Sequence, residues 1–365
     1  MVLLAPVAAD PRIRVLVIDD SAVVRRVITQ ALQGDPEIEV VANAPDGRAA
    51  VAAASRFQVD VAVLDIEMPI MDGLTAIPLL LKAVPGLKIL MASTRTARNA
   101  QVTLDALAAG ATDFILKPSA MREMPDVARF NRELLAKIKQ FGVKRAPISG
   151  IAPVTVARQP VPVATEPLAL RGASDFLPDI LVIGSSTGGP DALLQVLKEL
   201  PAHARVPILI VQHMPATFTG ILAARITRLC GIAAAEAVDG NKLEPGRVYV
   251  APGNFHMTVD AARVIRINQE PPENYCRPSL DPTLRSLAAA YGGSVLAVIL
   301  TGMGSDGLQG CKAVVDAGGT VIAQDEATSV VWGMPGAVAT AGLCSAVLPL
   351  TEIGPRLQPY LARRS

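Results

Sequence analysis

The chain has 365 residues, with 34 Lys and Arg against 33 Asp and Glu, so its formal net charge is +1. This length suggests two or three domains of roughly 150 residues, and a content of 51% apolar residues excludes a disordered chain. A charge so close to zero argues against a protein that binds nucleic acid along its phosphate backbone.

The N-terminal residues 1–9 faintly resemble a signal peptide but lack its basic start. No apolar run reaches the roughly 18 residues of a membrane span, so we expect a cytoplasmic protein that is not embedded in a membrane. The cysteines form no Cys-x-x-Cys pair, and we expect small buried thiols rather than disulfides or a zinc site. They are Cys230, Cys276, Cys311 and Cys344.

In residues 12–140, short apolar runs alternate with Ala- and Leu-rich segments of helical length. The runs predict strands at 13–18, 38–43, 59–64, 87–92 and 113–116. The segments predict helices at 22–33, 47–56, 73–84, 97–109 and 126–140. Strands that are apolar throughout are typical of a sheet covered on both faces. Five such βα units predict a doubly wound α/β domain.

Residues 141–178 are rich in proline and predict a semi-extended linker. From 179 to 365 the alternation returns, with strands expected at 180–184, 206–212, 294–301 and 320–324. Helices are expected at 191–200, 217–230, 282–291 and 307–317, and a hairpin at 256–259 and 263–267. The pattern predicts a second, three-layer α/β domain with an antiparallel hairpin insertion.

Polar residues follow the strands of the first domain, where ligands bind in open α/β sheets. They are Asp19, Asp20, Asp65, Ser93 and Lys117. Three carboxylates in one crevice repel one another unless a cation joins them, and such oxygen ligands suit Mg²⁺. A carboxylate beside Mg²⁺ can attack a phosphoryl group, and Lys117 and Ser93 are placed to bind its oxygens. The alternative is that these acids only cap the following helices.

The same residues carry a resemblance to a known family. Their pattern is Asp19-Asp20, Asp65 with Met68-Pro69 and Asp72-Gly73, Ser93, and Lys117-Pro118. Over about 12–140 this pattern resembles the receiver domain of two-component response regulators. The resemblance implies that Asp65 accepts phosphate from a histidine kinase while it and the aspartate pair hold Mg²⁺. It also implies that Ser93, Phe114 and Lys117 act in the switch.

A glycine-rich turn follows the first strand of the second domain. The sequence Gly184-x-Ser186-x-Gly188 fits a nucleophile elbow, in which small neighbours expose a serine hydroxyl on a sharp strand-to-helix turn. A phosphate cradle is an alternative, although no lysine follows as in a P-loop. A tight turn that needs glycine for steric reasons alone is another.

The chain has only three histidines. His213 follows the predicted strand 206–212 directly, at the edge where Ser186 is also expected, so it is the favoured base. His256 begins the insertion and is the second choice, whereas His203 lies at the wrong end of that strand.

A second glycine-rich loop, 300–307, follows the predicted strand 294–301. Asp306 in this loop is placed to accept from His213 and so fix its tautomer. The amide of Met303 is a candidate donor to an oxyanion. The alternative for Asp306 is an N-cap of the helix at 307–317. The order Ser186, His213, Asp306 differs from that of α/β-hydrolases.

Five ordered motifs complete the pattern: Ile-Gly-Ser-Ser186-Thr-Gly-Gly, Gln212-His213-Met-Pro, Ala-Pro-Gly-Asn-Phe-His256-Met, Arg277-Pro-Ser-Leu-Asp281 and Leu-Thr-Gly-Met303-Gly-Ser-Asp306-Gly. With the receiver-like half they resemble the bacterial chemotaxis protein-glutamate methylesterases over nearly the whole chain. The resemblance implies a phosphorylation-activated serine hydrolase that demethylates glutamate γ-methyl esters on chemoreceptors, releases methanol and deamidates glutamines. It implies Ser186 as nucleophile, His213 as base, Asp306 as orienting residue, Thr187 and Met303 beside the oxyanion, and no cofactor for the esterase step.

Alternatives remain within this interpretation. Ser185 stands where the family more often has alanine, so it is a second candidate nucleophile. A different serine hydrolase, such as an amidase or peptidase, is a rival, and so is a non-catalytic regulator whose second domain binds a partner. We also expect the unphosphorylated receiver to hinder the esterase.

Overall fold

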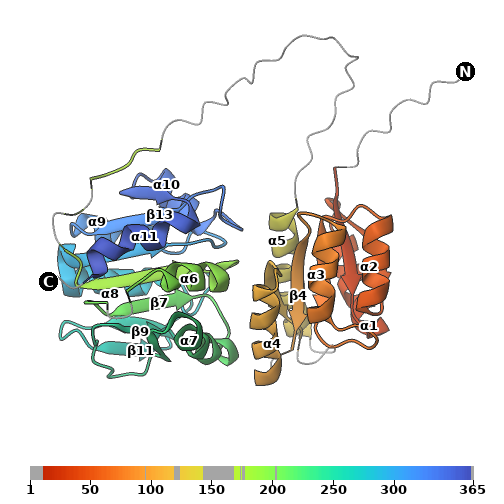
Figure 1. Ribbon diagram of the computed structural model, residues 1–365, viewed down its shortest axis with the longest axis horizontal. Coiled ribbons are helices and arrows are strands. Elements are labelled where there is room, and N and C mark those ends of the chain that lie inside the picture. Colours follow the sequence, from red (N-terminus) through yellow and green to blue (C-terminus); the bar gives the residue numbers. More distant parts are fainter. Residues whose placement is uncertain are drawn as a thin grey trace, which may run out of the picture. The chain divides into compact units, whose positions relative to one another are not determined.

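The structure is a computed structural model, and it describes residues 11–94, 96–118, 124–142, 168–172, 174, 177–201 and 204–362. Its contacts divide the chain into two compact units, which are described in turn (Figure 1). The signal-like segment, His203 and most of the predicted linker lie outside the described residues. Within those residues, no helix combines the length and hydrophobicity that crossing a bilayer requires.

The first unit contains a five-stranded parallel sheet in the order β2-β1-β3-β4-β5. Its strands are β1 (Ile13–Ile18), β2 (Ile38–Ala44), β3 (Val61–Asp65), β4 (Lys88–Ser93) and β5 (Asp113–Leu116). Along the chain they alternate with helices α1 (Ala22–Gln33), α2 (Gly47–Arg56), α3 (Gly73–Ala83), α4 (Ala97–Ala108) and α5 (Met124–Phe141). The division by contacts groups α4 with the second unit. Helix α1 contacts α5 and α2 contacts α3, and every residue of the central β3 is buried. The predicted doubly wound fold is confirmed.

The second unit is built on a seven-stranded parallel sheet in the order β14-β13-β12-β6-β7-β9-β8. Its strands are β6 (Ile180–Ser185), β7 (Ile208–Gln212), β8 (Ala233–Glu236), β9 (Arg247–Val250), β12 (Val295–Ile299), β13 (Thr320–Gln324) and β14 (Ala346–Leu348). Its helices are α6 (Gly189–Lys198), α7 (Ala216–Cys230), α8 (Leu280–Tyr291), α9 (Leu308–Asp316), α10 (Met334–Thr340) and α11 (Leu350–Leu361), with a 3₁₀ turn at Gly292–Ser294.

Two helix layers sandwich this sheet. Helix α6 contacts α7 and α11, while α8 contacts α9, which contacts α10. The strands β6 and β12 between the layers are buried throughout. An antiparallel hairpin of β10 (His256–Val259) and β11 (Ile265–Asn268) packs beside α8. The predicted three-layer domain with a hairpin insertion is therefore confirmed (Figure 1).

The strand order of the second sheet reverses at its centre. From β6 the chain continues through β7 toward β8, and it later returns to place β12 on the other side of β6. Ligands of such sheets bind at the carboxyl ends of the strands where the order reverses. Two backbone hydrogen bonds join these ends, from His213 N to Ser185 O and from Ser186 N to Thr301 O, each of 3.1 Å.

Candidate active site and phosphorylation site

The two adjacent serines at the end of β6 have different surroundings. Ser185 is 0% exposed, and its hydroxyl donates to Gln212 Oε1 at 2.6 Å. Ser186 is half-buried and begins the turn into α6. A Cβ on Gly189 would lie 2.1 Å from Gln212 Oε1, so the steric need for glycine is real at this position. Of the two serines, only Ser186 is partly exposed.

The imidazole of His213, just after β7, pairs with the Asp306 carboxylate from the loop after β12. Its Nε2 lies 2.7 Å from Asp306 Oδ2, so this nitrogen carries the proton while the carboxylate accepts. Asp306 is 1% exposed and receives five further hydrogen bonds. Their donors are Asn274 Nδ2 (3.0 Å), Ser279 Oγ (2.6 Å), Leu280 N (2.7 Å), Asp281 N (3.2 Å) and Gly307 N (3.0 Å). Gly307 is the N-cap residue of α9, and the helix receives no side-chain capping bond, so the N-cap interpretation of Asp306 is wrong.

The pair shifts the pKa of both members. Burial by itself would lower the pKa of His213, but its contacts with Asp306 and Cys276 outweigh burial and raise it well above its usual value. Burial would likewise raise the pKa of Asp306, yet the bonds from His213, the Leu280 amide and Ser279 lower it. The site thus stabilises an imidazolium beside a carboxylate, the charge state that a histidine base reaches during acyl transfer.

The other imidazole nitrogen faces a thiol. Cys276 Sγ lies 3.4 Å from His213 Nδ1, and among the described residues we find no hydrogen bond of the Ser186 hydroxyl. Cys276 and Cys230 are half-buried, whereas Cys311 and Cys344 are buried, so the expectation of four buried thiols is wrong for two of them. No spacing in the sequence signals the approach of Cys276 to a histidine 63 residues away.

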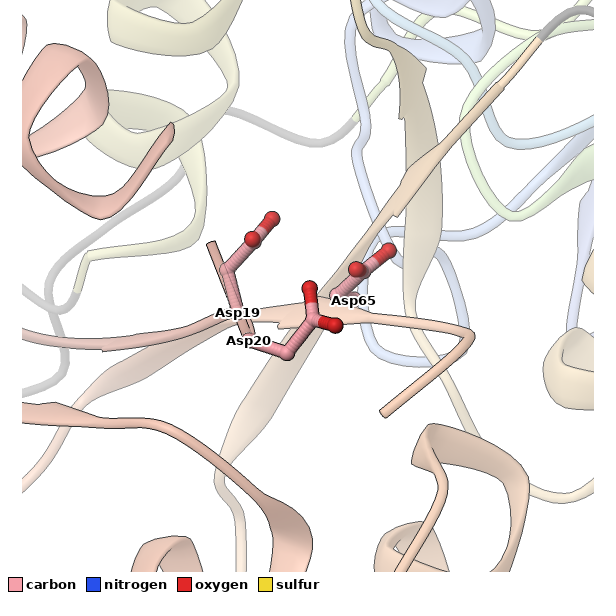
Figure 2. Close-up of side chains that lie close together, drawn as sticks. All are labelled: Asp19, Asp20 and Asp65. Carbon is pink, nitrogen blue, oxygen red and sulfur yellow. The ribbon is translucent and has the colours of Figure 1, made fainter. Parts of the chain in front are cut away.

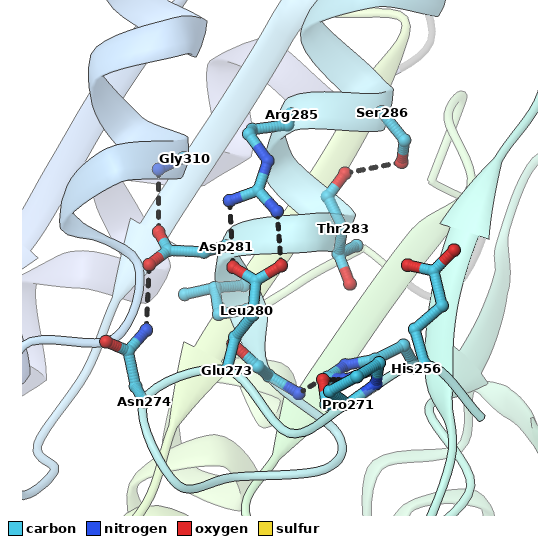
Figure 3. Close-up of polar contacts among 12 residues, drawn as sticks. His256, Pro271, Glu273, Asn274, Leu280, Asp281, Thr283, Arg285, Ser286 and Gly310 are labelled. Atoms are coloured by element: carbon cyan, nitrogen blue, oxygen red, sulfur yellow. Dashed lines mark hydrogen bonds and ion pairs between the residues drawn. The ribbon is translucent and has the colours of Figure 1, made fainter. Parts of the chain in front are cut away.

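The second-choice base, His256, makes structural contacts with both ring nitrogens. Its Nε2 lies 3.1 Å from the carbonyl oxygen of Pro271 (Figure 3). Its Nδ1 accepts from the backbone amide of Ser279 at 3.2 Å. The ring is 1% exposed, so His256 does not face a substrate. It holds the segment around Ser279, which also contacts Asp306.

Of the two residues expected beside the oxyanion, Thr187 directly follows Ser186 and Met303 lies in the loop after β12. Thr187 is buried, and its carbonyl accepts from Thr301 Oγ1. Met303 is exposed, and its amide donates to no backbone carbonyl in the part of the chain that the structure describes. A Cβ on Gly302 would lie 3.0 Å from Ser186 Cβ, so this loop packs directly on the serine. The amide of Met303 therefore stays a candidate donor to the oxyanion.

In the first unit, the side chains of Asp19, Asp20 and Asp65 gather at one edge of the sheet (Figure 2). One carboxylate oxygen from each lies within 4.8 Å of the others. Ser21 caps α1, so the first two aspartates are not its caps. Three hard oxygen donors around one point match the coordination chemistry of Mg²⁺. The residues present therefore fit this ion.

Lys117 joins this cluster. Its Nζ lies 2.6 Å from Asp19 Oδ2 and 2.7 Å from Asp65 Oδ1. Burial raises the pKa of the Asp65 carboxyl, and the ammonium of Lys117 opposes that rise. Ser93 ends β4 and is buried, its carbonyl accepting from Lys117 N at 2.7 Å. Phe114 lies buried on the adjacent β5. The structure thus brings Asp19, Asp20, Asp65, Ser93 and Lys117 to neighbouring strand ends, whereas Phe114 lies near the start of β5.

Two family descriptions match the chain: a response regulator receiver domain over residues 15–129 and a CheB methylesterase over residues 181–357. A protein-glutamate methylesterase/protein-glutamine glutaminase of Azospirillum brasilense is 54% identical, covering 97% of this chain and 94% of that protein. A relative of the same name, of the group 2 operon of Rhodospirillum centenum, is 53% identical, covering 98% and 96%.

A similar solved structure is the CheB methylesterase catalytic domain of Thermotoga maritima, with 43% identity and a TM-score of 0.48 over 49% of this chain and 97% of that chain. The two relatives extend over almost the full length of the chain, which confirms the family and the enzyme class expected from the motifs. The chain belongs to the CheB methylesterase family, with a response regulator receiver domain ahead of its methylesterase domain.

Proposed function

We propose that this chain hydrolyses glutamate γ-methyl esters on chemoreceptors, releasing methanol, and deamidates receptor glutamines at the same site. The observation that carries the proposal is the hydrogen-bonded His213–Asp306 pair at the strand ends beside Ser186. We assign Ser186 as nucleophile, His213 as base and Asp306 as the orienting carboxylate. This assignment rests on chemistry that requires a nucleophile, a base and a group that orients the base.

The reaction follows two acyl-transfer steps. His213 takes the proton of Ser186 at Nδ1, since Nε2 is bound to Asp306, and the serine oxygen attacks the ester carbonyl. The imidazolium returns this proton to the departing methanol, which is a poor leaving group without it. Water, deprotonated by the same imidazole, then hydrolyses the glutamyl-enzyme. Cys276, which faces Nδ1 at rest, gives way to the serine hydroxyl, because a thiol is a weak hydrogen-bond donor.

Negative charge on the carbonyl oxygen needs nearby donors. We assign the amide of Met303 as one donor, and Thr187, which directly follows Ser186, as the second residue beside the oxyanion. Such a donor contributes roughly 3–4 kcal/mol in other acyl-transfer enzymes. The uncapped N-terminus of α6, three residues after Ser186, adds a favourable dipole. No step of this esterase reaction requires a cofactor.

The test compares Ser186→Ala with Ser185→Ala by methanol release from a methylated receptor. We expect Ser186→Ala to abolish release. Ser185→Ala removes one buried hydrogen bond, a contribution of about 1 kcal/mol, and should retain most activity. The reverse ranking would move the nucleophile to Ser185. An amide or peptide substrate cleaved faster than the methyl ester would instead indicate a different serine hydrolase.

Regulation is assigned to the receiver. A histidine kinase phosphorylates Asp65, with Mg²⁺ held by Asp19, Asp20 and Asp65, and when bound this ion neutralises charge on the transferred phosphoryl oxygens. Lys117 contributes a second positive charge. Ser93 and Phe114 respond to the phosphoryl group, which adds a charge of about −1.5 to −2. The carboxylate cluster around Lys117 supports this assignment.

The proposed consequence is relief of inhibition of the esterase. An allosteric coupling of about 1–3 kcal/mol corresponds to roughly 5–150-fold activation. Acetyl phosphate should therefore raise methanol release by the full chain but not by Asp65→Asn, and deletion of residues 1–140 should raise basal release. Equal stimulation of the variant would refute the role of Asp65. The partners are thus a chemotaxis histidine kinase and methyl-accepting receptors in the cytoplasm, and not nucleic acid.

A further inference from the structure

The loop between β11 and α8 contains an unusual turn next to the catalytic pair. Asn274 and Tyr275 have φ values of 52° and 62°, a left-handed conformation that asparagine tolerates but that costs a residue such as tyrosine roughly 1–2 kcal/mol. The turn is closed by a hydrogen bond of 2.8 Å from Cys276 N to Glu273 O. Glu273 forms an ion pair with Arg285 of α8 (Figure 3). Strained backbone of this kind persists only where its surroundings hold it.

The side chain of Asn274 joins two buried carboxylates. Its amide nitrogen donates to Asp281 Oδ2 at 2.9 Å and to Asp306 Oδ1 at 3.0 Å. The other oxygen of Asp281 accepts from Gly310 N of α9 at 2.6 Å (Figure 3). Asp281 and Asp306 are 2% and 1% exposed. Two buried negative charges repel one another, and the Asn274 amide places a donor between them.

The bonds on Asp306 are divided between its two oxygens. Among the described residues, Oδ1 accepts from Asn274 and from three other donors, whereas Oδ2 accepts from His213 and one backbone amide. Asn274 therefore helps to fix the rotation of the carboxylate so that Oδ2 points at the imidazole. Cys276, two residues later, contacts the opposite nitrogen of the same ring. One turn thus touches both members of the pair.

We propose that Asn274 is a positioning residue of the esterase, whose amide holds the Asp306 carboxylate in the orientation that His213 requires. The inference rests on the proposed catalytic triad. It assigns to Asn274 no contact with the substrate; the residue acts only through Asp306.

The central variant is Asn274→Gly. Glycine adopts positive φ at no steric cost, so the turn is kept while the amide is lost. With a short peptide carrying a glutamate γ-methyl ester, we expect kcat to fall about 10-fold, as for a misplaced catalytic group, and KM to stay unchanged. The acid limb, in which kcat/KM rises with pH as His213 loses its proton, should move to lower pH. A carboxylate that is held less firmly stabilises the imidazolium less, so the pKa of His213 falls.

The neighbouring residue provides a matched control. Tyr275 has the same left-handed backbone and a fully exposed side chain, so Tyr275→Gly changes the same turn without touching Asp306. We expect wild-type kcat and an unmoved acid limb with the short peptide. Equal losses in Asn274→Gly and Tyr275→Gly would show that the backbone of the turn matters rather than the amide, and would overturn the inference.

Asp306→Asn separates this inference from the triad itself. If that variant keeps wild-type kcat, the proposed triad is wrong. If it loses activity while Asn274→Gly keeps both kcat and acid limb, only the role of Asn274 is refuted. Should Asn274→Gly fail to fold, Asn274→Asp serves in its place, since it keeps the size of the side chain and tolerates the turn. It puts an acceptor where both carboxylates need a donor, and wild-type kcat in this variant would refute the proposal.

Discussion

Replacement of Gly302 by alanine tests how tightly the loop after β12 fixes the nucleophile. A Cβ at this position would lie 2.4 Å from Met334 Sδ and 3.0 Å from both Cβ and N of Ser186. Met334 is fully buried, and Ser186 N is bonded to the Thr301 carbonyl. The flexible thioether of Met334 can shift within the core, but Ser186 cannot retreat without moving its own turn.

The size of the effect follows from these distances. Ordinary contacts begin at 3.4 Å, so Ser186 and the loop must separate by about 0.4 Å. Catalytic groups need placement within roughly 0.5 Å, and a 1 Å misplacement costs about 100-fold in rate. We therefore expect Gly302→Ala to lower kcat about 10-fold, and overpacking to lower the unfolding free energy by about 1–3 kcal/mol.

The assay is methanol release together with thermal unfolding. Gly220→Ala is the matched control, because this glycine lies inside α7 and its Cβ would meet only Glu236 Oε2, at 4.0 Å. Alanine should stabilise that helix by up to about 1 kcal/mol and leave kcat unchanged. If Gly302→Ala has a kcat within two-fold of wild type, the loop does not position Ser186, and the reasoning from its contacts fails.

Three further predictions concern charge, metal and packing. The rate of ester hydrolysis should rise with pH, with a midpoint above about 6.5, because the raised pKa of His213 means that the neutral base forms only at higher pH. Asp306→Asn should move this midpoint to lower pH and reduce kcat about 10⁴-fold. Chelation with EDTA should abolish labelling of Asp65 by acetyl phosphate while basal methanol release persists. Gly184→Ala would place a Cβ 2.0 Å from Leu280 Cδ2, so calorimetry should show about 1–3 kcal/mol lower stability.

The alternation of strands and helices could be predicted because buried parallel strands are continuous apolar runs. The prediction missed five elements, β8, β9, α10, β14 and α11, and of the three missed strands only β9 has a run of buried apolar residues, at 248–250. Strand β8 is an alanine-rich edge strand with no buried residue, and β14 has only three residues. Helix α10 has seven residues. Helix α11 contains Pro355 and Pro359, residues that usually indicate a break.

Ser186 and His213 could be placed at one edge of the sheet because each directly follows a parallel strand, and Asp306 because it lies in the loop after another such strand, β12. The His213–Asp306 bond was predicted, but the other hydrogen-bond partners of these two residues could not be predicted. Asn274 and Cys276 come from a loop after an edge hairpin, and no periodicity places that loop over the strand ends. The nearest signal was the motif that begins at Arg277, which marked the region without indicating which side chains turn inward.

The positions of the catalytic residues could be predicted but the further partners of Asp306 could not, and the reason lies in the burial of Asp306. An ionised carboxylate with 1% exposure is tolerated only when its oxygens are well supplied with donors. Here the donors come from the turn at Asn274, from the start of α8 and from Gly307, the residue after Asp306. The strand order decides where the carboxylate lies, whereas three segments together decide how it is oriented. Substitutions far from Ser186 in sequence, such as those at Asn274, should therefore change kcat before they change substrate binding.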